Sequence, residues 1–463
     1  MRRSFTPDNC LKMVMLSFLC LLLNGTPAIA AEQKVYKLDQ LIQMALETSS
    51  ELKMADQEIL SAKTDFKMAK AGMLPQLDVR AMTGPVNDAR TPTVQVDPTT
   101  MVGRLVSHDE DDVGIFGRLD FTITQPLYTF GKISNRKDAA ELGVEAQRAA
   151  RESKRNEVIL NVKELYYAYL VAAQGKQAAG ETDEFIEDAR KRIKNLIELK
   201  AQNAEPSDLY RLDAFAAEVK SFAAKADSGA RMAYAALKRA IGVPQTVEFR
   251  LDISELPKKP VILAPEGEYV QQAMEQRPEF TQVKKGVDAR RKLVEAAKAD
   301  LYPSFFAAAV GSVAGAPDRQ NFDNSYFPDD FNHAYAGFVA GAEWHFDFGI
   351  GKGKLDKARV EYEKTRLAQE LAEKSIPLEV MKYYNDALES QKGFTAYEQA
   401  AIASRRWIIT AFSNFDVGVG TARDIFDAID RYGKNQGEYL RALYNYHVAI
   451  ARLNYAIGLK TDI

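Results

Sequence analysis

The sequence predicts a mostly α-helical chain with a β-barrel segment, built as two repeats of helix, strand, strand, long helix and shorter helix. One observation is that residues 69–84 resemble residues 297–312, and that the same order of patterns follows both segments. Such internal similarity indicates that one structural unit occurs twice. The other is that four stretches of about ten residues alternate apolar and polar side chains, which is typical of strands with two different faces.

The first 30 residues are expected to be a secretory signal peptide. Two arginines and a lysine precede an apolar run at 13–23, and small residues ending at Ala30 suit a signal peptidase. The run is too short to span a bilayer, so we expect cleavage near Ala30 and not a transmembrane helix.

Composition narrows the function further. The only two cysteines, Cys10 and Cys20, lie in the expected signal, which leaves the mature chain without a thiol for a disulfide or a metal. The formal charge of the whole chain is −3, which argues against a nucleic-acid partner. Beyond the signal no apolar run reaches the roughly 18 residues of a membrane-spanning helix.

The first repeat is expected to occupy residues 31–241. In its first strand, Leu77, Val79 and Ala81 share one face and polar residues take the other. Its long helix lacks a stop signal over about 68 residues, so at 1.5 Å per residue it would be roughly 100 Å long. The expected elements are helices at about 38–72, 132–199 and 206–241, with strands at about 74–84 and 114–127.

The linker and second repeat follow at 242–265 and 266–463. The linker is rich in proline, and Pro377 is expected to kink or loosen the second long helix. Apolar residues of the last helix are spaced alternately by three and four, which indicates supercoiled helix packing. The expected elements are strands at about 302–313 and 334–348, with helices at about 266–300, 354–412 and 421–458.

Four two-faced strands cannot close a barrel alone. In lipid every backbone polar group must be paired, and bacterial barrels have at least about eight strands. Helices this long also need lateral partners. We therefore expect several copies of the chain to form one strand barrel in the outer membrane, continued by a helical barrel in the periplasm.

At this point the sequence resembles the TolC family of outer-membrane efflux channels. The resemblance covers essentially the whole mature chain, and its motifs are Gln125-Pro126-Leu127-Tyr128 before Phe130-Gly131 and, near the end, Val417-Gly418 followed by Asp424, Asp427, Asn445-Tyr446 and Gly458. It implies a homotrimer with a 12-stranded barrel in outer-membrane lipid. It also implies a passive exit duct of a tripartite efflux or type I secretion system, served by a periplasmic adaptor and an inner-membrane RND or ABC transporter.

The stretch 417–421 is expected to turn the chain at the tip of a helical hairpin, with Thr421 capping the next helix. Asp424 and Asp427 share one face of that helix. In one chain they would be a solvated edge; in a trimer they could form two rings of carboxylates that attract cations at the pore entrance. The resemblance places adaptor docking at both tips, on Ala204, Glu205, Pro206, Ser207, Val417, Gly418, Val419, Gly420 and Thr421.

Two positions depart from the family. Some members carry an arginine that locks the entrance where this chain has Gly420, and a tyrosine where it has Phe415. We expect Arg405, Arg406 or Arg423 to replace the missing lock.

Other functions fit less well. Gly418 and Gly420 resemble a dinucleotide loop, but Arg423 stands where a third glycine is needed. Glu343, His345 and Asp347 alternate along one strand like a metal triad, although polar residues are ordinary on a barrel lumen. A periplasmic adaptor-like hairpin protein would lack doubled strand pairs. We expect no enzyme activity and no cofactor, because no convergent catalytic set is visible.

Overall fold

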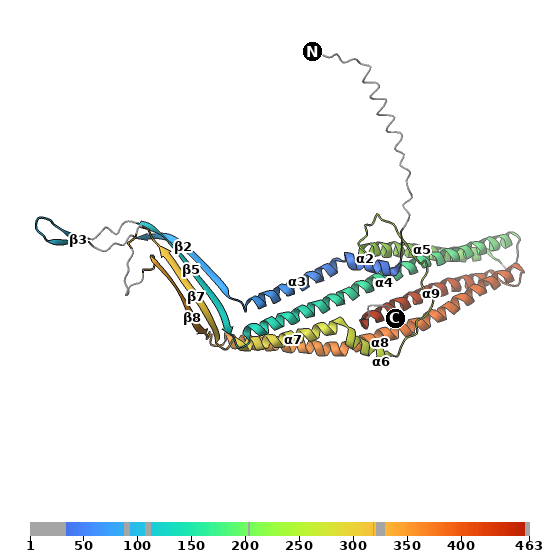
Figure 1. Ribbon diagram of the computed structural model, residues 1–463. Helices are drawn as coiled ribbons and strands as arrows, with labels where there is room; N and C mark the ends of the chain where they lie inside the picture. The colour runs from blue at the N-terminus through green and yellow to red at the C-terminus, as the bar shows by residue number, and fades with distance from the viewer. Residues whose placement is uncertain are drawn as a thin grey trace, which may run out of the picture.

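The computed structural model describes residues 34–87, 93–106, 113–201, 204–317, 319–320 and 329–458. The chain is elongated, with a β-sheet at one end and helices along the rest (Figure 1). It is mostly helical, as the sequence predicts. The expected signal peptide at 1–30 lies outside the described residues.

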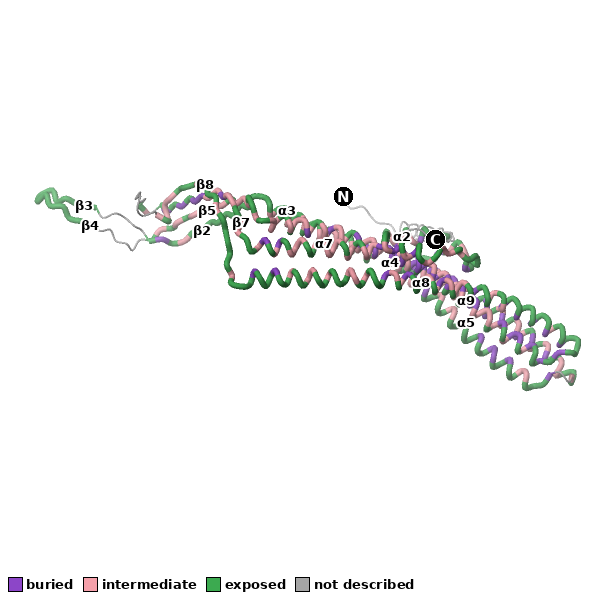
Figure 2. Tube along the Cα trace, turned by 90° about the horizontal axis from the view of Figure 1, so that it is seen from below, coloured by how far each residue is buried: buried purple, intermediate pink, exposed green. Residues whose placement is uncertain are grey.

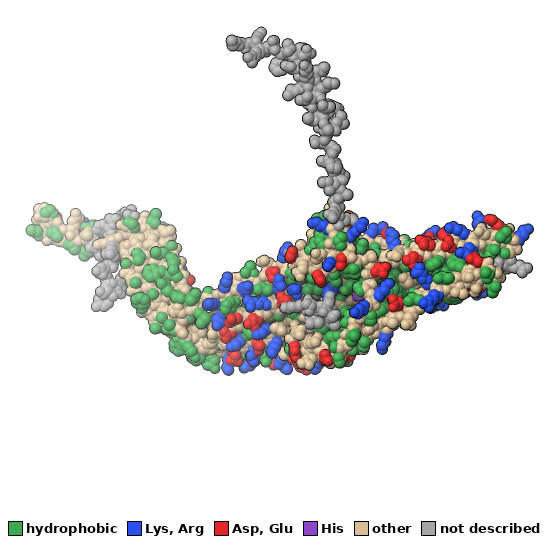
Figure 3. All heavy atoms as spheres, turned by 45° about the vertical axis from the view of Figure 1, so that its right-hand side comes forward, with side chains coloured by type: hydrophobic (Ala, Val, Ile, Leu, Met, Phe, Trp, Pro, Cys, Tyr) green, Lys and Arg blue, Asp and Glu red, His purple; other side chains and the backbone are tan. Residues whose placement is uncertain are grey.

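Four long strands form one antiparallel sheet in the order β2-β5-β7-β8, so β2 and β8 are its unpaired edges. Charged side chains gather over the helices on the face shown in Figure 3, while hydrophobic side chains dominate the sheet. The strands are β2 (Gln76–Asn87), β5 (Val113–Tyr128), β7 (Ser304–Gly315) and β8 (His333–Glu343).

The last strand is shorter than expected. β8 ends at Glu343, whereas the alternation predicts a strand to about residue 348. Phe348 and Gly349 have φ angles of 50° and 144°, and the Asp347 carboxylate accepts a hydrogen bond from the Gly349 N–H at 3.3 Å. These angles turn the backbone towards the next helix and are incompatible with an extended strand.

The helices occur in two series of equal lengths, namely 11, 22, 67 and 35 residues. The first series is α2 (Leu38–Thr48), α3 (Ser50–Ala71), α4 (Lys132–Glu198) and α5 (Pro206–Ala240). The second series is α6 (Glu266–Gln276), α7 (Pro278–Ala299), α8 (Ile350–Asp416) and α9 (Ala422–Ala456).

The single helices expected at 38–72 and 266–300 are each two helices. Ser49 breaks the first with a ψ of 119°, and its hydroxyl caps α3 by accepting from the Leu52 N–H at 3.3 Å. Arg277 breaks the second with a ψ of 122°, because it precedes Pro278, whose ring disfavours a helical residue before it.

Pro377 lies inside α8, and the helix continues beyond it to Asp416. The flanking side chains of Ile376 and Val380 are buried in a core cluster with α6 and the end of α9. This packing stabilises the helix on both sides of the proline, whose ring removes one backbone hydrogen bond.

The four longest helices form two hairpins, α4–α5 and α8–α9. The hairpins contact each other mainly where α4 packs against α9. Buried residues follow their facing sides in Figure 2, and one core cluster fills the end of the bundle farthest from the sheet. Two short sheets complete the described fold: β1 (Val35–Tyr36) pairs with β6 (Arg250–Leu251), and β3 (Thr93–Val96) pairs with β4 (Gly103–Val106). None of the described helices is long and apolar enough to cross a membrane.

Candidate functional site at the helical hairpin tips

The α8–α9 turn is a Schellman motif centred on Gly418. The Gly418 N–H donates to the Phe415 carbonyl at 3.1 Å, and the Val419 N–H donates to the Asn414 carbonyl at 3.0 Å. Gly418 has a φ of 80°, which glycine adopts without a Cβ penalty. Val417 and Val419 are 71% and 80% exposed, so the tip presents two apolar side chains to solvent.

The α4–α5 turn ends its helix in the same way, but with a lysine. The Lys200 N–H donates to the Ile197 carbonyl and the Ala201 N–H donates to the Leu196 carbonyl, both at 3.0 Å. Lys200 takes the left-handed position with a φ of 55°. A side chain there costs about 1 kcal/mol or more, so the two tips have the same geometry at different cost.

The two tips should therefore respond oppositely to substitution. Gly418→Ala should destabilise the hairpin by about 1 kcal/mol, because alanine is strained at positive φ. Lys200→Gly should instead stabilise it, by up to about 1 kcal/mol. Thermal unfolding of the purified protein checks both, and shifts of the same sign would contradict the motif assignment.

A capping box starts the helix after each tip, which confirms the cap expected at Thr421. The Asp424 N–H donates to the Thr421 Oγ1 at 3.4 Å, and the Asp424 carboxylate accepts from the Thr421 N–H at 2.8 Å and its hydroxyl at 2.7 Å. In the first hairpin, the Asp208 carboxylate accepts from the Glu205 N–H at 2.9 Å. Asp424 thus has a local structural role whatever it does in an assembly.

Asp424 and Asp427 are both exposed on α9. The hydrogen bonds from the Thr421 backbone and hydroxyl lower the pKa of Asp424 below its usual value. The Asp427 carboxylate lies 3.9 Å from the Arg423 Nε, a long contact on an open surface that adds little stability. Both carboxylates are therefore available to a cation or to a second copy of the chain.

The three arginines expected to lock the entrance lie at different distances from the hairpin tip. Arg423 is on the first turn of α9, at the tip. Arg405 is higher on α8 and lines a pocket with Tyr432 and Glu181, where the Tyr432 hydroxyl donates to the Glu181 carboxylate at 3.1 Å. Burial, with the nearby Glu181 charge, raises the pKa of Tyr432 to about 12. Arg406 is exposed on α8.

Sequence reasoning missed Arg192, which joins the two hairpins near their tips. Its guanidinium, on α4, pairs with the Asp416 carboxylate at the end of α8 and lies 4.9 Å from the centre of the Phe412 ring. The two ionic side chains are 40% and 49% exposed. Because 224 residues separate them, no local pattern in one sequence could have revealed the pair.

Gly420 leaves little room for the arginine that some family members carry there. It is buried, and a Cβ would lie 3.1 Å from both the Asn414 Cβ and the Phe415 N. Phe415 itself is 1% exposed in the tip core. The departure at residue 420 thus goes together with a tightly packed turn.

An arginine at residue 420 should disturb the α8–α9 turn and should not lock the pore entrance. Gly420→Arg is expected to lower the thermal stability of the assembled protein, since the backbone of residues 414–415 must move. Gly437→Arg, at a position on α9 with open space for a Cβ, is the matched control. Equal melting temperatures for the two variants would contradict the close packing.

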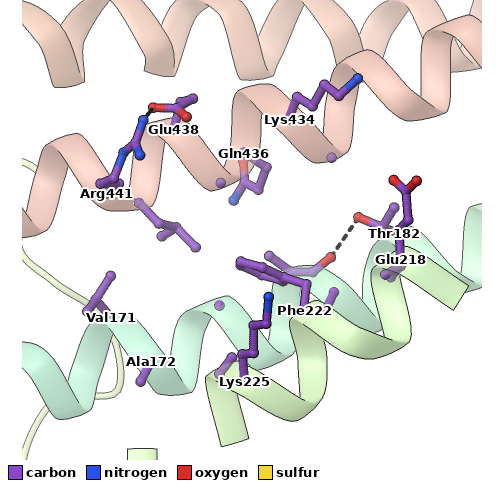
Figure 4. Close-up of a pocket in the computed structure, with 18 of the residues that line it drawn as sticks. Val171, Ala172, Thr182, Glu218, Phe222, Lys225, Lys434, Gln436, Glu438 and Arg441 are labelled. Carbon is purple, nitrogen blue, oxygen red and sulfur yellow. Dashed lines mark hydrogen bonds and ion pairs between the residues drawn. The ribbon is translucent and has the colours of Figure 1, made fainter. Parts of the chain in front are cut away.

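A groove lies between the two hairpins above the tips. Its volume is about 640 Å³, and small residues of α4 and α9, including Gly175 and Gly433, keep it open. Figure 4 shows Phe222 and Lys225 from α5 facing Gln436 from α9 across it. Its rim is charged with both signs, as expected of a solvent-facing surface.

The alternative sites are not assembled. α8 precedes the Gly418 turn, so the strand that a dinucleotide loop follows is missing. His345 and Asp347 lie beyond the end of β8 and no longer alternate with Glu343 on one strand. In the part of the chain that the structure describes, no three His, Cys, Asp or Glu side chains are grouped so that they could hold a metal ion.

Comparison with known proteins gives a consistent picture. The family model for outer membrane efflux proteins matches residues 41–198 and 269–459. The alkaline protease secretion protein AprF of Pseudomonas aeruginosa is 23% identical over 90% of this chain and 84% of its own length. Outer membrane protein TolC of Vibrio cholerae is 31% identical, but over 20% of this chain and 21% of its own.

Solved structures share the fold. The outer-membrane channel OprN superposes with a TM-score of 0.75 at 17% identity, over 91% of this chain and 89% of its own. The outer membrane protein VceC of Vibrio cholerae gives a TM-score of 0.73 at 16% identity, over 91% and 96% of the two chains. At this identity the likeness concerns the fold alone.

Proposed function

The chain belongs to the outer membrane efflux protein family, and from this premise we propose that it is the outer-membrane exit duct of a tripartite efflux or type I secretion system. Substrates delivered by an inner-membrane RND or ABC transporter and a periplasmic adaptor would leave through it passively. The observation that carries the proposal is a four-stranded sheet with two open edges, set on a helical body with a separate hairpin tip.

The open edges require further copies of the chain. β2 and β8 have 12 and 11 residues, and an unpaired edge of that length is not tolerated in lipid. Pairing β2 of one copy with β8 of the next closes the sheet. Three copies, the number implied by the family resemblance, give twelve strands, which is within the range of known outer-membrane barrels.

The same arrangement assigns the ends of the molecule. The sheet would lie in the outer membrane, and the helices would extend into the periplasm with their tips at the pore entrance. There Asp424 and Asp427 would form the two carboxylate rings, and residues 204–207 and 417–421 would dock the adaptor. Arg423, Arg405 and Arg406 remain proposed lock residues, to which the structure adds the Arg192–Asp416 pair.

The stoichiometry is tested by the mass of the protein extracted from outer-membrane fractions in mild detergent. A trimer that resists mild heating is the expected result, because its barrel strands are paired all round. A monomer that stays folded and soluble without detergent would refute the duct.

A further inference from the structure

A small hairpin projects beyond the main sheet, between β2 and β5 (Figure 1). Its strands β3 and β4 make four cross-strand pairs. The turn is ordered by Asp97, whose carboxylate accepts from the Thr99 N–H at 2.8 Å and whose carbonyl accepts from the Met101 N–H at 2.9 Å. The Asp97 N–H donates in turn to the Val102 carbonyl at 3.1 Å. The segment is therefore a defined hairpin with a closed loop.

The hairpin has two unlike faces. Register pairs Val94 with Leu105, and Val96 lies two residues along on the same side. These three side chains form what we call the apolar hairpin face, and Val94, Leu105 and Val96 are 62%, 70% and 51% exposed. The opposite face carries the paired Gln95 and Arg104.

No other described element packs extensively against this face. Among element pairs in extensive contact within the described residues, β3 and β4 contact only each other. An isolated two-stranded hairpin is at best marginally stable in water. Three neighbouring branched aliphatic side chains left in water add a cost of about 25 cal/mol for each Å² of apolar surface.

A second copy of the chain fits this face better than other partners. The hairpin lies between β2 and β5 in the chain, so in an oligomeric barrel the hairpins of all copies would project from the same end. Residues 93–106 carry one acid, Asp97, and one base, Arg104, so identical hairpins do not repel one another. A lipid surface would favour aromatic or several basic side chains, and the segment has no aromatic residue.

We propose that the apolar hairpin face packs against the same hairpin of the neighbouring copies, so that three hairpins form one apolar cluster beyond the end of the barrel. The inference rests on the proposed oligomeric duct and goes beyond it by assigning a second interface outside the barrel wall. Val94, Val96 and Leu105 would be its core, with Gln95 and Arg104 facing solvent.

Thiol cross-linking tests this directly, because both native cysteines lie in the expected signal peptide. Val94→Cys and Val96→Cys place a thiol on the apolar hairpin face, and Gln95→Cys is the matched control between them. With a short bifunctional maleimide, we expect covalent dimers to form several-fold faster in the first two variants than in the control. The mass of each variant in detergent is measured first, to establish its oligomeric state.

The outcomes separate the two proposals. An intact trimer with equal or no cross-linking at all three positions overturns the hairpin contact and leaves the duct standing. An intact trimer in which the thiols of Val94→Cys and Val96→Cys react only with a membrane-soluble maleimide also overturns it, because lipid then covers the face. A monomeric native protein refutes the oligomer, and the hairpin contact with it.

Discussion

Changing both Asp424 and Asp427 to asparagine is expected to relieve block of the channel by trivalent cations added on the periplasmic side. Three copies would bring six carboxylates around one narrow axis, and closely spaced like charges bind multivalent cations strongly. We expect at least a tenfold loss of blocker affinity, equivalent to about 1.4 kcal/mol. Asparagine is preferred to alanine because its oxygen can still accept from the Thr421 N–H in the capping box.

The matched control is Asp430→Asn. Asp430 lies one turn further along α9, but its carboxylate is already paired with Lys434 at 2.9 Å. It should leave block and selectivity unchanged. If the double variant is blocked as strongly as the native channel, the carboxylate rings are wrong and Asp424 is only a helix cap.

The pH dependence of the block follows from the same geometry. The hydrogen bonds from Thr421 lower the pKa of Asp424. Its carboxylate therefore stays charged to a lower pH than that of an ordinary aspartate, whose pKa is about 3.9. Cation block should therefore persist on acidification to about pH 5, and it should fade only when the pH falls through the lowered pKa. A block that titrates near neutral pH would show that repulsion among the ring carboxylates outweighs these hydrogen bonds, because neighbouring like charges raise the pKa of a carboxyl group.

Reversing the charge of Arg192 is expected to open the entrance. In Arg192→Glu, two carboxylates would face each other between α4 and α8 where an ion pair now joins the hairpins. Exposed pairs contribute only about 0–1 kcal/mol to stability, so the melting temperature should change little. The mean single-channel conductance should increase several-fold, because the hairpins separate at the tip.

Two further variants decide whether the contact itself matters. Exchanging the charges in Arg192→Glu/Asp416→Arg should restore the native conductance. Lys191→Glu changes the charge next door, where the partner Asp188 is on the same helix at 3.8 Å, and should have no effect. Failure of the exchanged pair to restore conductance would show that Arg192 acts in another way.

The sequence predicted the tip better than the body above it. Local signals were enough for the α8–α9 turn, because glycine at Gly418 and the Thr421–Asp424 box are decided within a few residues. The break at Ser49 was missed because serine is also tolerated within helices. The break at Arg277 was missed too, although the following Pro278 carried a readable signal. The resemblance to the TolC family is confirmed by the family match.

The features that could not be predicted depend on residues far apart in the sequence or on additional copies of the chain. Arg192 and Asp416 meet only after four helices have packed, and the lack of space at Gly420 depends on how the turn folds back onto Asn414. The proposed pairing of β2 with β8 would join separate copies, so neither one sequence nor one chain contains it. The expected site residues accordingly remain predictions for the assembled protein.

Single-channel recording of the purified mature protein in a planar bilayer tests the exit duct most directly. We expect discrete, cation-selective conductance steps that trivalent cations block from one side only, since the carboxylates would lie at the periplasmic end. A properly folded, detergent-stable oligomer that shows no conductance, even with Arg192→Glu, would contradict the account.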